Sequence, residues 1–316
     1  MSKRKKEDER LQRIPVGGPV TWVNITRPDM KLLEKLKAQF PFFMDMDLKD
    51  CLPPYQRPKI LERDQYLFMV LLFPMLDPKT GGILPYEVDF FIGRDFLVTS
   101  HLGNHETMRA LAAACGEGST ACELKPDHDA LRLSLDVVHE MIVSCFPNVT
   151  DVSNSLISLE GRLFKNDGST LVKEMLRLKT NIVAFRKALQ GYESTLKKLM
   201  DRGRKFFDVD RVRTQYEDIA GHGREILGFL ENDRDTIYAM SDAHLTLVTY
   251  KTNNATKTLT ALAFIIFPMN LVAAVFSMHA TDMPFSGKPN DFWWMLATIF
   301  STMLVIVTFL KKKKWL

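Results

Sequence analysis

The sequence predicts an α+β domain, followed by a long helical stalk and two C-terminal transmembrane helices. Three observations lead to this fold class. Strand patterns are confined to residues 20–145, the stretch 153–257 is helical in pattern and free of proline, and two apolar segments near the C-terminus lack charge. The composition hides this division, because 46% hydrophobic and 25% charged residues over 316 positions are also typical of a soluble protein.

We expect seven regions. They are a charged N-terminal tail (1–19), an α/β domain (20–145), a helical region with a long stalk helix (146–257), a first transmembrane helix (258–280), an outer loop (281–291), a second transmembrane helix (292–310) and a basic tail (311–316).

Alternating and β-branched residues predict the strands of the first domain. They lie at Val20–Ile25, Gln65–Leu76 and Glu87–His101, and the last forms a hairpin that turns at Gly93-Arg94. Apolar residues at helical spacing predict helices over Pro28–Phe40, Glu106–Ala114 and Asp129–Val143. Together these elements indicate a mixed α/β domain.

The helical region is expected to break at Asp167-Gly168 and near Phe206–Asp210. Asp208 is a candidate cap for a final helix of about 70 residues that continues into the first transmembrane segment. Three glycines on this helix, Gly221, Gly223 and Gly228, each weaken it by about 1 kcal/mol relative to alanine. So long a helix needs neighbours, either the α/β domain or copies of itself.

The two apolar segments, 258–281 and 292–310, contain no Asp, Glu, Lys or Arg, and each matches the roughly 20 residues needed to cross a bilayer. The four lysines at 311–314 follow the second segment directly. Basic residues remain on the cytoplasmic side. We therefore expect an integral protein of the cell (inner) membrane with both termini in the cytoplasm.

No enzyme motif accounts for the chain. The glycine-rich Gly116–Thr120 lacks the lysine of a phosphate loop, and His101, His105 and Glu106 lack an established metal-ligand spacing. A formal net charge of +4 is small for a nucleic-acid-binding protein. We expect neither enzymatic activity nor nucleic-acid binding.

Several segments, in order, resemble the CorA-type divalent cation transporters. They are TWVNI, DCLPPYQRPKILERDQYLFMVLL (Asp50–Leu72), EVDFFIGRDFLVTSH, TYKTNNATKTLTALAFIIFPMN (Thr249–Asn270), MPF and KKKKWL. The resemblance covers nearly the whole chain and implies a homopentamer with two spans per subunit. It also implies divalent cations such as magnesium or zinc as substrate and gating ligand, with no resident cofactor. The family signature Gly-Met-Asn is replaced here by Ser277-Met278-His279, which questions the family's magnesium selectivity.

The resemblance implies that the first span lines the pore, and the residue spacing permits this. One helical face carries Thr256, Leu259, Ala263, Phe267, Asn270, Ala274 and Met278. Asn270 is the strongly polar residue of the span, so a ring of its amides would face a hydrated cation, unless it forms a helix–helix hydrogen bond. Leu259 and Phe267 would form apolar rings that gate by dewetting, or would only pack against lipid or helices.

The outer mouth would be formed by Ser277, Met278, His279 and Asp282. A ring of His279 imidazoles would coordinate zinc, cobalt or nickel, whereas magnesium prefers oxygen ligands. The alternative is an interfacial histidine that contacts no ion, and Asp282 is either an attractor of cations or a solvated carboxylate.

Two further questions stay open at the level of sequence. The family's cytoplasmic cation sensor would use acidic stalk residues, for which the candidates are Asp208, Asp210, Glu217, Asp218, Asp233 and Asp235. These alternate with arginines, as a solvated surface also does. The altered signature is in turn compatible with a membrane scaffold or signalling protein that has kept the fold without transporting ions.

Overall fold

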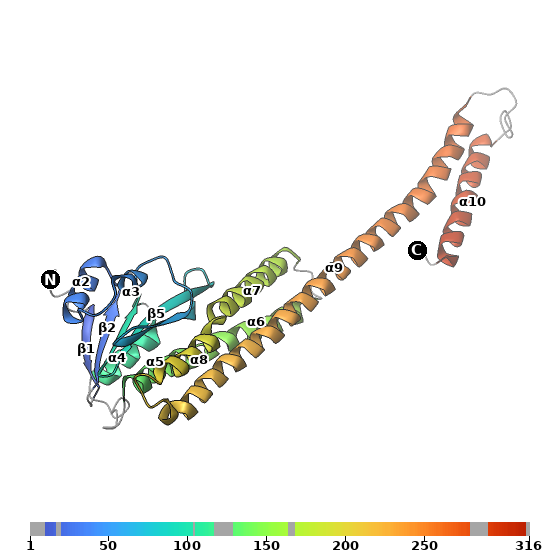
Figure 1. Ribbon diagram of the computed structural model, residues 1–316. Coiled ribbons are helices and arrows are strands. Elements are labelled where there is room, and N and C mark those ends of the chain that lie inside the picture. The colour runs from blue at the N-terminus through green and yellow to red at the C-terminus, as the bar shows by residue number, and fades with distance from the viewer. Residues whose placement is uncertain are drawn as a thin grey trace. The chain divides into compact units, whose positions relative to one another are not determined.

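The computed structural model describes residues 10–16, 20–103, 105–116, 129–163, 168–278 and 290–313. The chain divides into two compact units, Met1–Met240 and Ser241–Leu316. The first contains a six-stranded sheet with its covering helices, and the second contains a helical hairpin (Figure 1).

The sheet has the strand order β1-β2-β6-β5-β4-β3. Its strands are β1 (Leu11–Pro15), β2 (Thr21–Thr26), β3 (Lys59–Glu62), β4 (Tyr66–Leu76), β5 (Ile83–Gly93) and β6 (Phe96–His101). All neighbours are antiparallel except β2 and β6, which pair in parallel from Thr21–Phe96 to Thr26–His101. The predicted hairpin at Gly93-Arg94 is confirmed by the antiparallel pairing of β5 with β6.

Both faces of the sheet are buried. On one face, Phe68 and Val70 of β4 join a cluster with Leu33 and Leu36 of α2 (Met30–Gln39) and with residues around α3 (Asp45–Asp50). On the other face, Leu67, Met69, Leu71 and Phe73 of β4 pack in the core beneath four helices. These helices are α4 (Glu106–Gly116), α5 (Ala130–Val143), α7 (Gly168–Leu189) and α8 (Tyr192–Gly203). Burial on both faces explains why β4 is a continuous apolar run and not an alternating one.

A buried ionic network joins α3 to the sheet. The Asp47 side chain is fully buried, and its carboxylate accepts hydrogen bonds from Arg63 Nε at 2.8 Å and from the Tyr66 hydroxyl at 2.6 Å. The backbone N–H of Met44 donates in turn to the Tyr66 oxygen at 2.9 Å. Because a buried carboxylate is costly without partners, this network fixes α3 against the edge of β4.

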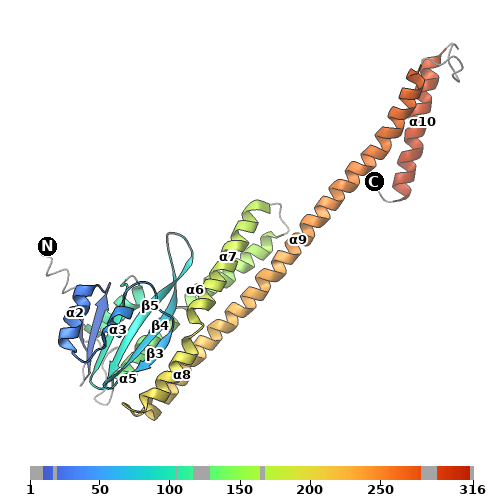
Figure 2. The same ribbon diagram turned by 45° about the horizontal axis from the view of Figure 1, so that its top comes forward.

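The helical region begins with α6 (Phe146–Arg162), which is followed by α7 and α8. Figure 2 shows α6 and α7 side by side as an antiparallel pair. The one-turn helix η2 (Val209–Val212) then leads into α9 (Arg213–Ser277), whose 65 residues confirm the long helix expected from the sequence. The expected side-chain cap by Asp208 does not form, because Asp208 precedes η2 and makes no capping hydrogen bond there.

The first part of α9 packs within the N-terminal unit. Asp233 accepts a hydrogen bond from Ser153 of α6 at 2.8 Å, and the Lys179 ammonium of α7 lies 4.4 Å from the ring centroid of Tyr238. At Gly223 an added Cβ would lie 2.7 Å from the Tyr192 ring of α8, so glycine permits this close approach. The expectation that the long helix needs neighbours is confirmed for this segment.

Two strands and a helix of the domain were not expected from the sequence. Leu11–Pro15 lies in the stretch assigned to a charged tail, yet it pairs with β2 as strand β1. The short α3 and β3 were also missed, as was the break between α7 and α8 at Gln190-Gly191.

The second unit consists of the C-terminal part of α9 and α10 (Asp291–Lys312), which runs back alongside it (Figure 1). Both helices are long and apolar enough to cross a membrane, and their apolar windows carry mostly exposed side chains. The contact between them includes buried Ala261 and Leu310, and Phe264, Pro268 and Ile306 line a cavity of about 370 Å³ beside it. The helix continues through Pro268 without interruption.

Candidate functional site

The expected pore stripe lies on α9, within the second unit. Its residues are Thr256, Leu259, Ala263, Phe267, Asn270, Ala274 and Met278; Met278 follows directly after the end of the helix. All are exposed except Ala263, which is half-buried, and Leu259 and Phe267 expose 70% and 71% of their surface. Exposed side chains at this spacing leave most of one helical face of α9 without packing against the described residues.

This face points away from α10. The α9 residues that are buried or half-buried in the hairpin include Ala261, Ile265, Pro268, Val272 and Phe276. Successive side chains on an α-helix are rotated by about 100° about the helix axis, so these buried residues point on average about 180° away from the residues of the stripe. The hairpin therefore uses one side of α9 for α10 and leaves the side that carries Asn270 for other partners.

The outer mouth is described in part. Ser277 is the last residue of α9, and the N–H of Met278 donates to the Val275 carbonyl at 3.2 Å. Both side chains are exposed. His279 and Asp282 lie outside the described residues.

Five of the six acidic stalk candidates are engaged in ion pairs or hydrogen bonds within the N-terminal unit. Asp208, Asp210, Glu217 and Asp235 form ion pairs with Arg211, Arg204, Arg213 and Arg234, and Asp233 accepts its hydrogen bond from Ser153. These contacts fit the alternative of a solvated or structural surface. Asp218 differs from them, because its carboxylate faces histidine side chains.

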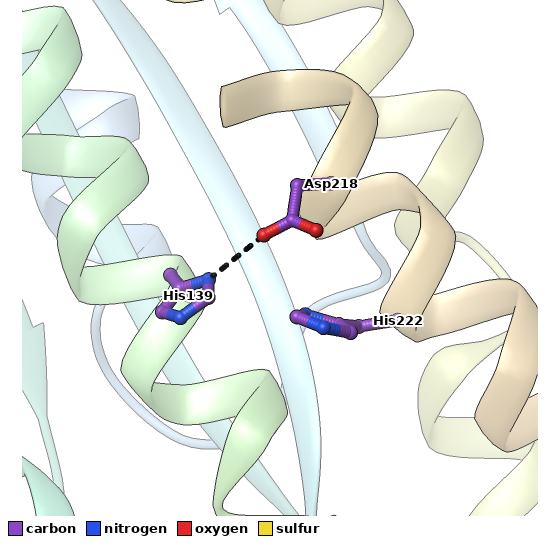
Figure 3. A group of neighbouring side chains, drawn as sticks. All are labelled: His139, Asp218 and His222. Atoms are coloured by element: carbon purple, nitrogen blue, oxygen red, sulfur yellow. Dashed lines mark ion pairs between the residues drawn. The ribbon is translucent and has the colours of Figure 1, made fainter. Parts of the chain in front are cut away.

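Asp218 forms a cluster with His139 and His222, which we call the His-Asp-His cluster. Figure 3 shows His139 on α5 and the other two residues one turn apart on α9, with the three side chains converging. His139 Nδ1 lies 3.9 Å from Asp218 Oδ2, and one ligand atom from each residue lies within 4.8 Å of the others. The imidazole centroids of His139 and His222 are 5.4 Å apart.

Neighbouring contacts hold the cluster in register. One turn earlier on both helices, Gln215 Nε2 of α9 donates to Asp136 Oδ1 of α5 at 2.5 Å. Burial raises the pKa of Asp136, and the hydrogen bond from Gln215 opposes that shift. The His222 ring packs edge-on against Phe146 at 5.6 Å, and its Nδ1 atom is buried without a hydrogen-bond partner among the described residues.

The donor set fits a borderline divalent cation. Imidazole nitrogens suit zinc, nickel and cobalt, and a carboxylate suits these and harder ions. A histidine four residues after an aspartate places both ligands on one helical face. A metal ion would provide a bonding partner for the His222 Nδ1 atom, which is buried and has no hydrogen-bond partner among the described residues. Water would complete the shell, since three protein ligands leave an open position on zinc.

Comparison with known proteins relates this architecture to a family. The family model described as CorA-like Mg²⁺ transporter protein matches residues 18–313. The chain belongs to this family. This is a family of metal-ion transporters and not of enzymes, and its members are membrane proteins with two C-terminal spans, in agreement with the two apolar helices of this chain.

The CorA-family relatives match along nearly the whole chain. A putative metal ion transporter of Bacillus subtilis, YfjQ, is 25% identical over 305 residues, which cover 93% of this chain and 89% of the relative. The cobalt/magnesium transport protein CorA of Thermotoga maritima is 23% identical over 296 residues, covering 94% and 83%. The complete structure of the CorA magnesium transporter from Methanocaldococcus jannaschii shares the fold with a TM-score of 0.83 at 18% identity, covering 94% of this chain and 92% of that one.

Proposed function

We propose that this CorA-family chain assembles into a homopentamer whose α9 helices surround a pore for divalent cations. The pore crosses the inner membrane, and both termini of each subunit lie on its cytoplasmic side. The observation that carries the proposal is the Asn270 face of α9, which is exposed in one subunit and directed away from α10. Two spans are too few to enclose a pore. Copies arranged around an axis would bring this face to the centre.

Permeation through this pore would use a hydrated ion. The stripe from Thr256 to Met278 carries no carboxylate, and Asn270 is its one amide. Magnesium releases its water reluctantly. A ring of Asn270 side chains suits outer-shell hydrogen bonds to such an ion, while rings of Leu259 and Phe267 would close the pore by dewetting.

The Ser277-Met278-His279 mouth would broaden selectivity toward zinc, and also cobalt or nickel, because imidazole coordinates these ions directly. Transport of each metal by a His279→Asn variant tests this. We expect a preference shifted toward magnesium. Unchanged relative rates would remove His279 from the selectivity of the channel.

The His-Asp-His cluster would act as a regulatory cation site. An ion held there would join α5 to α9 and so restrain the helix that continues into the pore. Occupancy rising with the concentration of the transported ion would close the channel by negative feedback. This assigns the sensor role to Asp218 among the acidic stalk residues.

The membrane potential would drive uptake. Each elementary charge that moves through 100 mV gains about 2.3 kcal/mol, hence about 4.6 kcal/mol for a divalent cation. At about 1.4 kcal/mol per decade, a potential negative inside favours import by a few thousand-fold. The lysines at 311–313 at the end of α10 support a cytoplasmic C-terminus.

The full-length protein in liposomes that contain a metal-sensitive dye tests this function. We expect a dye response to external magnesium or zinc that grows with an inside-negative potential. No dye response to magnesium, zinc, cobalt or nickel would favour the competing function, a membrane scaffold that has kept the fold without transporting ions. The altered Ser277-Met278-His279 signature is the feature that supports this alternative.

A further inference from the structure

The N-terminal unit contains a basic pocket at the edge of the sheet, separate from the His-Asp-His cluster. It has a volume of about 600 Å³ and lies where β1 and β2 meet α4. Its lining includes three arginines, Arg10, Arg27 and Arg109, together with the polar side chains of Asn24 and Thr26. The volume is within the usual range for a small-molecule site.

The charges in this basic pocket do not cancel. Arg10 Nη1 forms an ion pair with Asp29 Oδ2 at 2.9 Å. Among the described residues, neither Arg27 nor Arg109 takes part in an ion pair, and both are exposed. Two guanidinium groups therefore remain for an anion, and their planar donor forks match carboxylate and phosphate oxygens.

A buried hydrogen-bond network supplies a neutral donor to the same pocket. Trp22 Nε1 donates to Thr99 Oγ1 at 2.9 Å, so the Thr99 hydroxyl proton is free to donate to Asn24 Oδ1 at 2.8 Å. The Gly103 N–H donates to His101 Nδ1 at 3.0 Å, which leaves the proton on Nε2 to reach Asn24 Oδ1 at 2.9 Å.

The direction of this network fixes the role of Asn24. The Asn24 side-chain oxygen accepts both of these hydrogen bonds. Asn24 also lines the pocket, and the group that it has left to offer there is its Nδ2 amide, which is a hydrogen-bond donor. The Asn24 side chain is 2% exposed and thus held rigidly by its partners. Burial lowers the pKa of His101 to about 4, so the network stays neutral and in this arrangement at neutral pH.

The backbone around the pocket is shaped at a conformational cost. Arg27 has φ of +52°, which is uncommon for a residue other than glycine, and its N–H donates to the His101 carbonyl at 2.7 Å. Gly103 has φ of +75°, and an added Cβ would lie 3.0 Å from Thr26 Cβ. Glycine adopts this conformation without strain, so the conformational cost falls on Arg27, and such outliers cluster where the surrounding structure holds a functional geometry in place.

We propose that the basic pocket binds a small phosphate-bearing ligand of nucleotide size. The Arg27 and Arg109 guanidinium groups pair with phosphate oxygens, the Asn24 amide donates a further hydrogen bond, and Arg10 is held in place by Asp29 at the rim. Two guanidinium groups without an ion pair among the described residues and one neutral amide donor repel a cation and favour an oxyanion. The volume exceeds that of inorganic phosphate and accommodates a nucleoside phosphate.

Calorimetric titration of the full-length protein in nanodiscs, with EDTA present to exclude bound metal, tests the proposal. The probes are ATP, inorganic phosphate and adenosine. We expect ATP to bind more tightly than inorganic phosphate, adenosine not to bind, and affinity to fall between 50 and 500 mM NaCl because the ion pairs are screened. Binding of adenosine alone, or no binding of either phosphate compound at millimolar concentration, would overturn the proposal.

Two variants locate the site. Arg27→Gly removes a guanidinium while relieving the positive φ, so the protein should be at least as stable as the parent while binding ATP about ten- to a hundredfold more weakly. Arg109→Gln, at an exposed position of α4, should weaken binding to a similar extent. The matched control is Arg13→Gln, since Arg13 contacts Gln39 on the other side of β1. Equal ATP affinity in all three variants would place the ligand elsewhere.

Discussion

Replacement of His222 by leucine tests the metal-binding cluster. A zinc ion 2.0–2.2 Å from each ligand requires tetrahedral ligand atoms that are about 3.3 Å apart. His139 and Asp218 are now 3.9 Å apart, and the three ligand atoms lie within 4.8 Å of one another. Side-chain rotations that close these gaps by about 1.5 Å or less would complete the site. Zinc at a hundred times its dissociation constant would then stabilise the folded state by about 2.7 kcal/mol.

For a unit of this size, that stabilisation corresponds to a rise in Tm of about 5–10 °C. The assay is thermal unfolding of the detergent-solubilised protein in EDTA, in zinc and in magnesium. We expect a larger rise with zinc than with magnesium, and its loss in His222→Leu and in Asp218→Asn. The matched control is His244→Leu, which removes another histidine of α9 and should keep the full rise. An unchanged rise in His222→Leu would refute the cluster as a metal site.

Two further predictions concern the N-terminal domain. Burial raises the pKa of Glu87 from 4.5 to about 7, so between these pH values the folded state holds a proton that the unfolded state has lost. The free energy of unfolding should therefore fall by about 3 kcal/mol as pH rises from 4.5 to 7. Urea denaturation measures this fall, which should be smaller in Glu87→Gln. Asp47→Ala should lower the free energy of unfolding by about 3–5 kcal/mol because it leaves Arg63 and the Tyr66 hydroxyl without their buried acceptor. Asp64→Ala, an exposed neighbour, should change it by less than about 0.5 kcal/mol, and similar losses in both aspartate variants would argue against the network.

Much of the fold could be predicted because its signals are local. The apolar run of β4, the turn between β5 and β6 and the helical spacing in α2 and α5 are each encoded by neighbouring residues. Strand β1 was missed because it is short and follows a highly charged segment. Its stability comes from pairing with β2, which no local pattern reports. The same holds for α3, whose position depends on the Asp47 network.

The candidate sites divide in the same way. The stripe on α9 is a periodic pattern within one helix, so the sequence alone could define it. Within the His-Asp-His cluster, the spacing of Asp218 and His222 was a readable signal. His139 lies on α5, and only the packing of α5 against α9 brings it to them.

The measurement that tests the account most directly is ion flux through an Asn270→Leu variant. The central claim is that the Asn270 face of α9 lines a water-filled pore. Full-length protein in liposomes with an inside-negative potential should import magnesium or zinc. Asn270→Leu should abolish this flux, because it removes the amide ring from the stripe. The matched control Ser301→Leu makes a polar-to-leucine change in α10 and should keep the flux. Flux in Asn270→Leu equal to that of the parent protein would contradict the account.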